Sequence, residues 1–345
     1  MKQITLNESE VPILEAQKLA EFNAIYYLES HFIDISSTLS LGLQPENTVR
    51  KCRYCQKDSM SVAFKNFAHL VPELMGFKYL TTRYECDGCN KFFGKRYDNE
   101  LAKFIGSGRT IAGIDGKKGI PKTESISSNV FVQSERNKNM LKLRMGGQFP
   151  IEDITFNHSD NSIEMSFQEP PFTPLNVIKS LYKIGYGVLR DDELLSYKCL
   201  HRFLMNRHTE KGGKDFAFPY WINYLFPYSI NLENAISLFS KKNGEVLDCF
   251  FDKILIIKFA NNIYQIPLSS DKNIEFALEN KELSMPQYPI LIDRKLHEPY
   301  GGYSIKVQDS SSPLISKPDK TRVKIHFADS NATLKVWTSP VFMDT

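Results

Sequence analysis

The chain has 345 residues, of which 42% are hydrophobic and 24% are charged, an ordinary composition for a globular protein of about two or three domains. No apolar run approaches the roughly 18 residues that a membrane span needs, and the first residues lack the apolar core of a signal peptide. The six cysteines are too few for a disulfide scaffold in a chain of this length. We therefore expect a cytoplasmic protein with no membrane segment.

The net charge of +3 is unevenly distributed. Residues 50–122 contain 15 Lys and Arg but 7 Asp and Glu, a local net charge of +8, which leaves the rest of the chain at −5. A basic region of this kind is typical of a surface that binds a polyanion, since phosphate contacts supply most non-specific affinity. A solvated basic face without a ligand is the alternative, and charge alone does not decide between the two.

The predicted elements lie in order along the chain. Apolar residues at helical spacing predict a helix over 12–32. Later patterns predict a short helix over 98–105, a β-hairpin over about 151–168, helices over about 173–206 and strands after residue 250. These segments mix helical and strand patterns without an internal repeat, so we predict an α+β fold.

Three parts of the chain differ in pattern. Residues 1–48 read as an N-terminal helical segment with a connector, residues 49–122 as a module rich in cysteine and basic residues, and residues 123–345 as a mixed α+β domain. We expect the C-terminal domain to recognise a signal ligand, a partner protein or the substrate.

Four of the six cysteines form two Cys-x-x-Cys pairs about thirty residues apart. In a reducing compartment this spacing favours metal binding over disulfides. Four thiolates are a closed tetrahedral ligand set for structural zinc, and an iron site of the rubredoxin type has the same ligands. We predict a zinc ion held by Cys52, Cys55, Cys86 and Cys89, one that stabilises the fold rather than taking part in chemistry.

Two polar residues near these pairs suggest a second, catalytic centre. His69 follows a predicted strand over 62–67, and Asn90 comes directly after the second cysteine pair. A neutral imidazole can take a proton from water near neutral pH, as the hydrolysis of a phosphodiester requires. A structural role is the alternative for each, as a buried hydrogen-bonded histidine and as a helix cap.

Three runs of residues together resemble the HNH endonuclease family: CRYC at 52–55, HLVPELMG at 69–76 and CDGCNKFFG at 86–94. The resemblance covers roughly residues 52–104, in the branch with a treble-clef zinc knuckle. It implies a zinc-stabilised ββα-metal module that hydrolyses DNA. It also implies that His69 is the general base and that Asn90 helps to hold a catalytic Mg²⁺ or Mn²⁺.

The chain departs from the family pattern at two positions. The residue before the histidine is normally an acidic metal ligand, but here it is Ala68, and Thr82 stands where the family has its middle asparagine. Hard cations need carboxylate or phosphate oxygens, which Asp98 or the DNA would have to supply. The alternative is a catalytically degenerate zinc module that binds nucleic acid or a partner protein.

Two further expectations concern partners. We expect exposed basic side chains of the module and of the glycine-rich loop that follows it to bind DNA phosphates, namely Lys91, Lys95, Arg96, Lys117 and Lys118. Residues 173–195 resemble a helical segment found after the nuclease in bacterial proteins of this group, some of which act in phage defence. That resemblance implies a role in antiviral defence.

Overall fold

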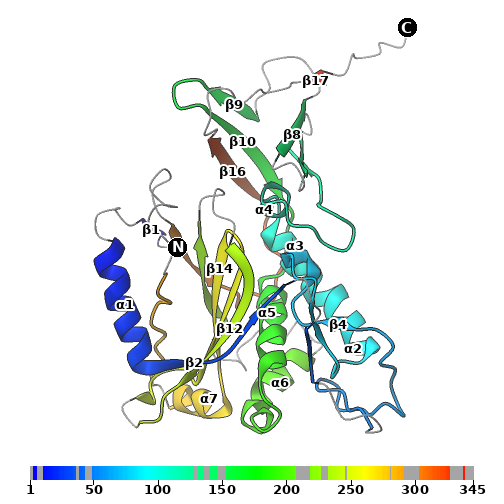
Figure 1. Ribbon diagram of the computed structural model, residues 1–345, viewed down its shortest axis with the longest axis vertical. Helices are drawn as coiled ribbons and strands as arrows, with labels where there is room; N and C mark the ends of the chain where they lie inside the picture. Colours follow the sequence, from blue (N-terminus) through cyan, green and yellow to red (C-terminus); the bar gives the residue numbers. More distant parts are fainter. Residues whose placement is uncertain are drawn as a thin grey trace. The chain divides into compact units, whose positions relative to one another are not determined.

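A computed structural model describes residues 3–5, 11–35, 39–42, 49–127, 130–135, 140–145, 153–206, 218–226, 232–244, 247–279, 281–290, 303–326 and 337–338. The chain divides into two compact units (Figure 1). The first unit comprises Met1–Pro72, Phe77–Leu101 and Thr173–Ile315, and the second comprises Glu73–Gly76, Ala102–Phe172 and Ser316–Thr345. The cysteine pairs and the long strands of the C-terminal half therefore belong to the same unit.

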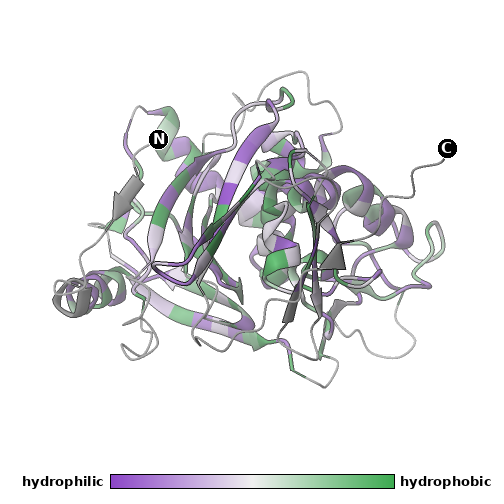
Figure 2. Cartoon of the chain, turned by 90° about the horizontal axis from the view of Figure 1, so that it is seen from above, coloured by the Kyte–Doolittle hydropathy of each residue, from purple (hydrophilic) through white to green (hydrophobic). Residues whose placement is uncertain are grey.

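A seven-stranded antiparallel sheet forms the centre of the first unit. Its strand order is β1 (Gln3–Thr5), β15 (Ser304–Asp309), β11 (Tyr220–Leu225), β14 (Asn262–Leu268), β13 (Lys253–Ala260), β12 (Leu232–Lys241) and β2 (Tyr26–Ile33). Figure 2 shows apolar and polar residues interspersed along the strands of the chain. The central strand β13 is apolar on both faces and almost wholly buried, as expected for a strand covered on both sides.

The predicted N-terminal helix ends early. Helix α1 spans Val11–Ile25, and residues 26–33 form strand β2, which pairs with β12. The prediction of helix over 26–32 is therefore wrong. Tyrosine, phenylalanine and isoleucine fit a half-buried strand well, and an available sheet edge satisfies their backbone groups. Phe22 and Ile25 of α1 pack with Tyr26 of β2 in the core beside the sheet.

Helix α5 (Pro174–Val188) confirms the helix predicted from residue 173, with Thr173 at its N-cap. All of its residues from Leu175 to Val188 are buried. It contacts β14 of the sheet, and it is followed by a 3₁₀ turn η4 (Leu194–Tyr197) and by α6 (Lys198–Met205). Helix α7 (Asp271–Leu278) begins at a capping box formed by Ser270.

Two glycines on opposite faces of α5 allow close packing on both sides. A Cβ added at Gly185 would lie 2.4 Å from Leu268 of β14. A Cβ added at Gly187 would lie 2.5 Å from Leu70 and 2.9 Å from the hydroxyl of Tyr84. Two positions in a helix are separated by about 200°, so one face of α5 meets the sheet and the other meets the cysteine module.

The cysteine module contributes a second, small sheet to the first unit. Its order is β3 (Leu39–Leu41), β5 (Leu80–Thr82) and β4 (Ala68–His69), followed in the chain by α2 (Asp87–Phe93) and the π-helical turn η2 (Gly94–Asp98). The strand predicted over 62–67 is wrong, since these residues form a loop. Backbone N–H groups of Lys65 and Asn66 bind the Asp87 carboxylate instead of a strand partner.

The second unit contains two small sheets. Strands β6 (Thr123–Glu124), β7 (Val130–Glu135), β8 (Met140–Met145) and β17 (Trp337–Thr338) form one of them, and β9 (Ile154–Asn157), β10 (Ser162–Glu169) and β16 (Asp319–His326) form the other. The pairing of β9 with β10 confirms the hairpin predicted over 151–168. Helix α3 (Asn99–Ile105) confirms the helix predicted over 98–105, and α4 (Gly108–Ile111) and η1 (Glu73–Met75) complete the described helices. None of the described helices has both the length and the apolar character that crossing a membrane requires.

We expect Gly185→Ala and Gly187→Ala each to lower the free energy of unfolding by about 1 kcal/mol, because overpacking costs about 1–3 kcal/mol and outweighs the gain of about 1 kcal/mol in helix propensity. Gly94→Ala is the matched control, since nothing lies within 4 Å of its Cβ position. That variant should gain about 0.4–1 kcal/mol. Denaturant unfolding followed by circular dichroism compares the three, and a stabilised Gly187→Ala variant would contradict the close approach at that face.

Candidate functional site

The four cysteines of the two pairs meet in one cluster. Their sulfur atoms all lie within 4.8 Å of one another. The Sγ atoms of Cys52 and Cys89 are 3.8 Å apart, and those of Cys55 and Cys86 are 3.7 Å apart. A tetrahedral zinc ion with Zn–S bonds of about 2.3 Å requires sulfurs about 3.8 Å apart. The cluster therefore has the dimensions to hold a zinc ion.

Backbone N–H groups donate to two of the cysteine sulfurs. Cys86 is the N-cap of α2, and its Sγ accepts a hydrogen bond from the backbone N–H of Cys89 at 3.4 Å. The Sγ of Cys52 accepts from the backbone N–H of Cys86 at 3.5 Å. A hydrogen bond with the Cys89 thiol, aided by backbone donors that include the N–H of Cys86, lowers the pKa of the Cys52 thiol to about 5, whereas burial raises the pKa of the Cys86 thiol to about 11. Thiolates are the form in which cysteine binds metal.

His69 lies on β4, the first strand of the order β4, β5, α2. In the antiparallel pair, His69 lies opposite Thr81, and Ala68 lies opposite Thr82. Ala68 and Thr82 are buried, whereas His69 is half-buried. Both departures from the family pattern thus fall on one cross-strand pair, and that pair offers a methyl group and a hydroxyl but no carboxylate.

Asn90 lies inside α2, one residue after Cys89. Its backbone N–H donates to the Cys86 carbonyl at 3.0 Å, and Cys86 occupies the N-cap. The alternative that Asn90 caps a helix is therefore wrong. Its side chain is partly exposed and carries an amide oxygen of the kind that hard cations accept as a ligand.

The described residues do not offer a complete second metal site. Among them, the four cysteines are the one group of three or more His, Cys, Asp or Glu side chains with ligand spacing. Position 68 carries no donor, and Oδ1 of Asp98 accepts a hydrogen bond from Ser180 of α5 at 2.6 Å. Mg²⁺ and Mn²⁺ prefer several oxygen ligands, so water and phosphate oxygens would have to supply most of them here.

A buried ion pair lies behind the histidine strand. Nζ of Lys183 on α5 is 3.1 Å from Oε2 of Glu85 and donates to the backbone carbonyl of His69 at 3.1 Å. Both side chains are at most 2% exposed. Burial raises the pKa of the Glu85 carboxyl to about 7, although the charge and hydrogen bond of Lys183 act in the opposite direction.

The first cysteine pair holds the C-terminal end of the same helix. The Arg53 guanidinium donates to the carbonyls of Gly187 at 2.8 Å and Leu189 at 2.9 Å, and to the Asp191 carboxylate at 2.6 Å. It also stacks over the ring of Tyr84, 3.9 Å from the centroid. These bonds satisfy carbonyls that the end of a helix leaves without intrahelical partners, and they place a cation where the helix dipole favours one.

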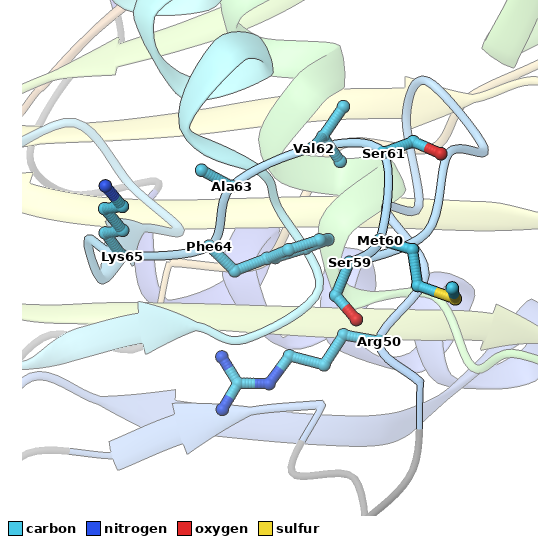
Figure 3. A pocket seen from close by; sticks show the side chains of 8 residues that line it. All are labelled: Arg50, Ser59, Met60, Ser61, Val62, Ala63, Phe64 and Lys65. Atoms are coloured by element: carbon cyan, nitrogen blue, oxygen red, sulfur yellow. The ribbon is translucent and has the colours of Figure 1, made fainter.

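A surface pocket is lined by residues 59–65, which follow the first cysteine pair in the sequence, and by Arg50. Its volume is about 590 Å³. Figure 3 shows Phe64 extended toward Met60, with the Arg50 side chain running alongside. The loop is fixed to α2 because backbone N–H groups at Lys65 and the next residue bind the Asp87 carboxylate, bonds that lower the pKa of that carboxyl.

The predicted DNA contacts fall in both units. Lys91 and Lys95 are exposed and Arg96 is half-buried, all in or just after α2 in the first unit. Lys117 and Lys118 are exposed in a loop of the second unit that a bridge between residues 116 and 119 closes.

The residues that sequence reasoning missed lie on α5. Ser180 contacts Asp98 from 82 positions downstream, and Lys183 contacts the histidine strand from 114 positions downstream. One signal pointed to them. The stretch contains two lysines four positions apart, Lys179 and Lys183, in the middle of an otherwise apolar helix, and buried lysines require a partner.

Comparison with known proteins gives one match. Residues 52–104 match the model of the HNH endonuclease family. No curated protein and no solved structure matches the chain. The match spans the cysteine cluster, the strand with His69 and helix α2. This chain therefore contains an HNH endonuclease domain at residues 52–104, with a four-cysteine cluster that fits a zinc ion.

Proposed function

We propose that the protein is a metal-dependent endonuclease of HNH type that hydrolyses phosphodiester bonds in DNA. The family match over residues 52–104 carries the proposal. The position of His69 on the first strand of a strand, strand, helix order supports it, as does the net charge of +8 over residues 50–122. The treble-clef arrangement of the knuckles and the role in phage defence stay predictions.

His69 is the general base in this proposal. Its neutral imidazole accepts a proton from a water molecule while the water oxygen bonds to phosphorus. The bond from phosphorus to the leaving sugar oxygen breaks, and that oxygen takes up a proton, so one water molecule is consumed. A divalent ion would supply stabilisation of negative charge on the phosphate oxygens, with Asn90 as its expected protein ligand.

Basic side chains hold the DNA backbone. Lys91 lies in α2, and Lys95 and Arg96 lie in η2, which follows it in the first unit. Lys117 and Lys118 are the corresponding exposed cations of the second unit. The pocket beside Arg50 adds a cation next to an aromatic ring, a combination that suits an unpaired nucleotide. Phosphate contacts of the basic side chains orient the DNA without reading its sequence.

One observation favours a second function, a zinc module that binds nucleic acid or a partner protein without cleaving. The buried pair of Ala68 and Thr82 provides no anionic ligand where the family has one. A module of this kind would yield no cleavage with any divalent ion, yet its affinity for DNA would fall steeply with salt.

We expect His69→Ala to abolish nicking of supercoiled plasmid in Mg²⁺, Mn²⁺ or Ni²⁺ without lowering zinc content or DNA affinity. The loss should be at least about 100-fold, the usual contribution of a general base. His158→Ala is the control, because that histidine is exposed on a hairpin of the second unit. Cleavage that survives His69→Ala would exclude this residue as the base.

We expect the purified chain to contain about one zinc ion, since four thiolates form one closed site. We expect the Cys86→Ser variant to lose the zinc ion and to melt at a lower temperature. Structural zinc affinity is folding free energy. Cys199→Ser is the matched control, because Cys199 lies outside the cluster. Metal analysis and thermal unfolding measure both effects, and a Cys86→Ser protein with full zinc content and unchanged melting would refute the four-cysteine site.

We expect Ala68→Asp to lower the Mn²⁺ concentration required for half-maximal cleavage, because a carboxylate is a better ligand for a hard cation than a methyl group. The buried charge should also lower the melting temperature without Mn²⁺, and added Mn²⁺ should restore it. Ala16→Asp, at an exposed position of helix α1, controls for added charge. Equal responses of the two variants would argue against a metal site next to His69.

A further inference from the structure

Helix α5 presents three positions to the endonuclease domain along one face. Ser180 binds Asp98, Lys183 binds the carbonyl of His69, and Gly187 packs against the residue that follows the histidine. Spacings of three and seven residues place these positions one above another on a helix. The domain that matches the endonuclease family therefore rests on a helix that begins about seventy residues after the matched segment ends.

Of these three positions, Lys183 is the charged one. Its ammonium lies 3.1 Å from the His69 carbonyl oxygen and 3.1 Å from the Glu85 carboxylate. It is 2% exposed, so water cannot replace either interaction. Glu85 directly precedes Cys86, the N-cap of α2. One ammonium thus joins the histidine strand to the start of the helix that carries Asn90.

The strand that carries His69 is short, and bonds to β5 hold the residues on either side of the histidine, from the Leu70 N–H to the Leu80 carbonyl and from the Thr82 hydroxyl to the Ala68 carbonyl. Strand β4 contains two residues and pairs on one side with β5. A displacement of the His69 backbone would move the imidazole directly, since the side chain has only two rotatable bonds. A proton acceptor displaced by about 1 Å can lose about 100-fold in rate.

We propose that Lys183 is a positioning residue for His69, acting through the backbone carbonyl of the histidine and held in place by Glu85. This inference rests on the proposed endonuclease function. In this proposal helix α5 is part of the nuclease. The segment 52–104 alone would lack Lys183, which contacts its histidine strand.

Lys179 provides a matched comparison on the same helix. It is as buried as Lys183, at 2% exposure, but its Nζ donates to the carbonyl of Asn206 at 3.0 Å and lies over the rings of Phe203 and Tyr97, away from the histidine strand. A purely structural requirement for buried lysines in α5 would apply to both residues. A positioning role applies to Lys183 alone.

The test uses the full chain and the double variant Lys183→Met with Glu85→Gln. The second change removes the carboxylate that would otherwise remain buried without a cation, because an unpaired buried charge is itself destabilising. Lys179→Met is the control. Single-turnover cleavage over a range of DNA concentrations separates the rate at saturation from the affinity for DNA, and zinc content and thermal unfolding report the fold.

We expect the double variant to lose about 100-fold in the rate at saturating DNA, with zinc content, melting temperature and half-saturating DNA concentration close to those of the wild type. Lys179→Met should keep the wild-type rate. A double variant that cleaves at the wild-type rate would overturn the proposal. An equal loss of cleavage rate in Lys179→Met would also overturn it, and so would a loss of rate that merely parallels a lower melting temperature. Absence of cleavage by the wild type would instead overturn the proposed function, and this inference with it.

Discussion

The carbonyls at the C-terminal end of α5 need hydrogen-bond donors, and Arg53 of the first cysteine pair supplies them. A helix buried along its whole length cannot rely on water for this purpose. The donor lies between two zinc ligands of the predicted site, so the conformation of the knuckle and the end of the helix depend on each other. Tyr54, the other residue between the cysteines, donates to the Lys183 carbonyl of the same helix at 3.2 Å. The cysteine cluster therefore anchors the central helix of the unit as well as its own loop.

The contacts of α5 also explain why glycine, serine and lysine interrupt an apolar helix. Gly185 allows the sheet to approach, Gly187 allows the endonuclease domain to approach, and Ser180 and Lys183 satisfy polar groups that the approach buries. Each of these four residues contacts or accommodates a specific neighbour. A helix that packed against the sheet alone would need none of the polar ones.

The sequence predicted the meeting of the two cysteine pairs, which depends on short spacing, but it missed the features that depend on distant contacts. The two cysteine pairs meet as predicted, and the order of strands and helix around His69 follows from a continuous segment. The second half of the N-terminal helix was wrong because tertiary pairing with β12 decided the conformation of residues 26–33. The contribution of α5 to the site could not be read from spacing, since Lys183 and His69 are separated by 114 positions. Only the unusual lysines within an apolar helix pointed to it.

For the proposed nuclease activity, the pair of Ala68 and Thr82 limits how a divalent ion could be bound. Without a carboxylate at position 68, the protein contributes less negative charge to a divalent ion, and hard cations bind in proportion to such charge. A nuclease built in this way would bind its ion mainly when DNA phosphates complete the ligand set. Metal binding and substrate binding would then be linked, and each would strengthen the other. The four-cysteine cluster and the contacts of α5 do not depend on that ion. The cluster is formed by sulfur atoms, and α5 is bound through hydrogen bonds to the Asp98 carboxylate and the His69 carbonyl. Under the proposed function, the fold would therefore be stable without the divalent ion, and the catalytic centre would be complete only when DNA is bound.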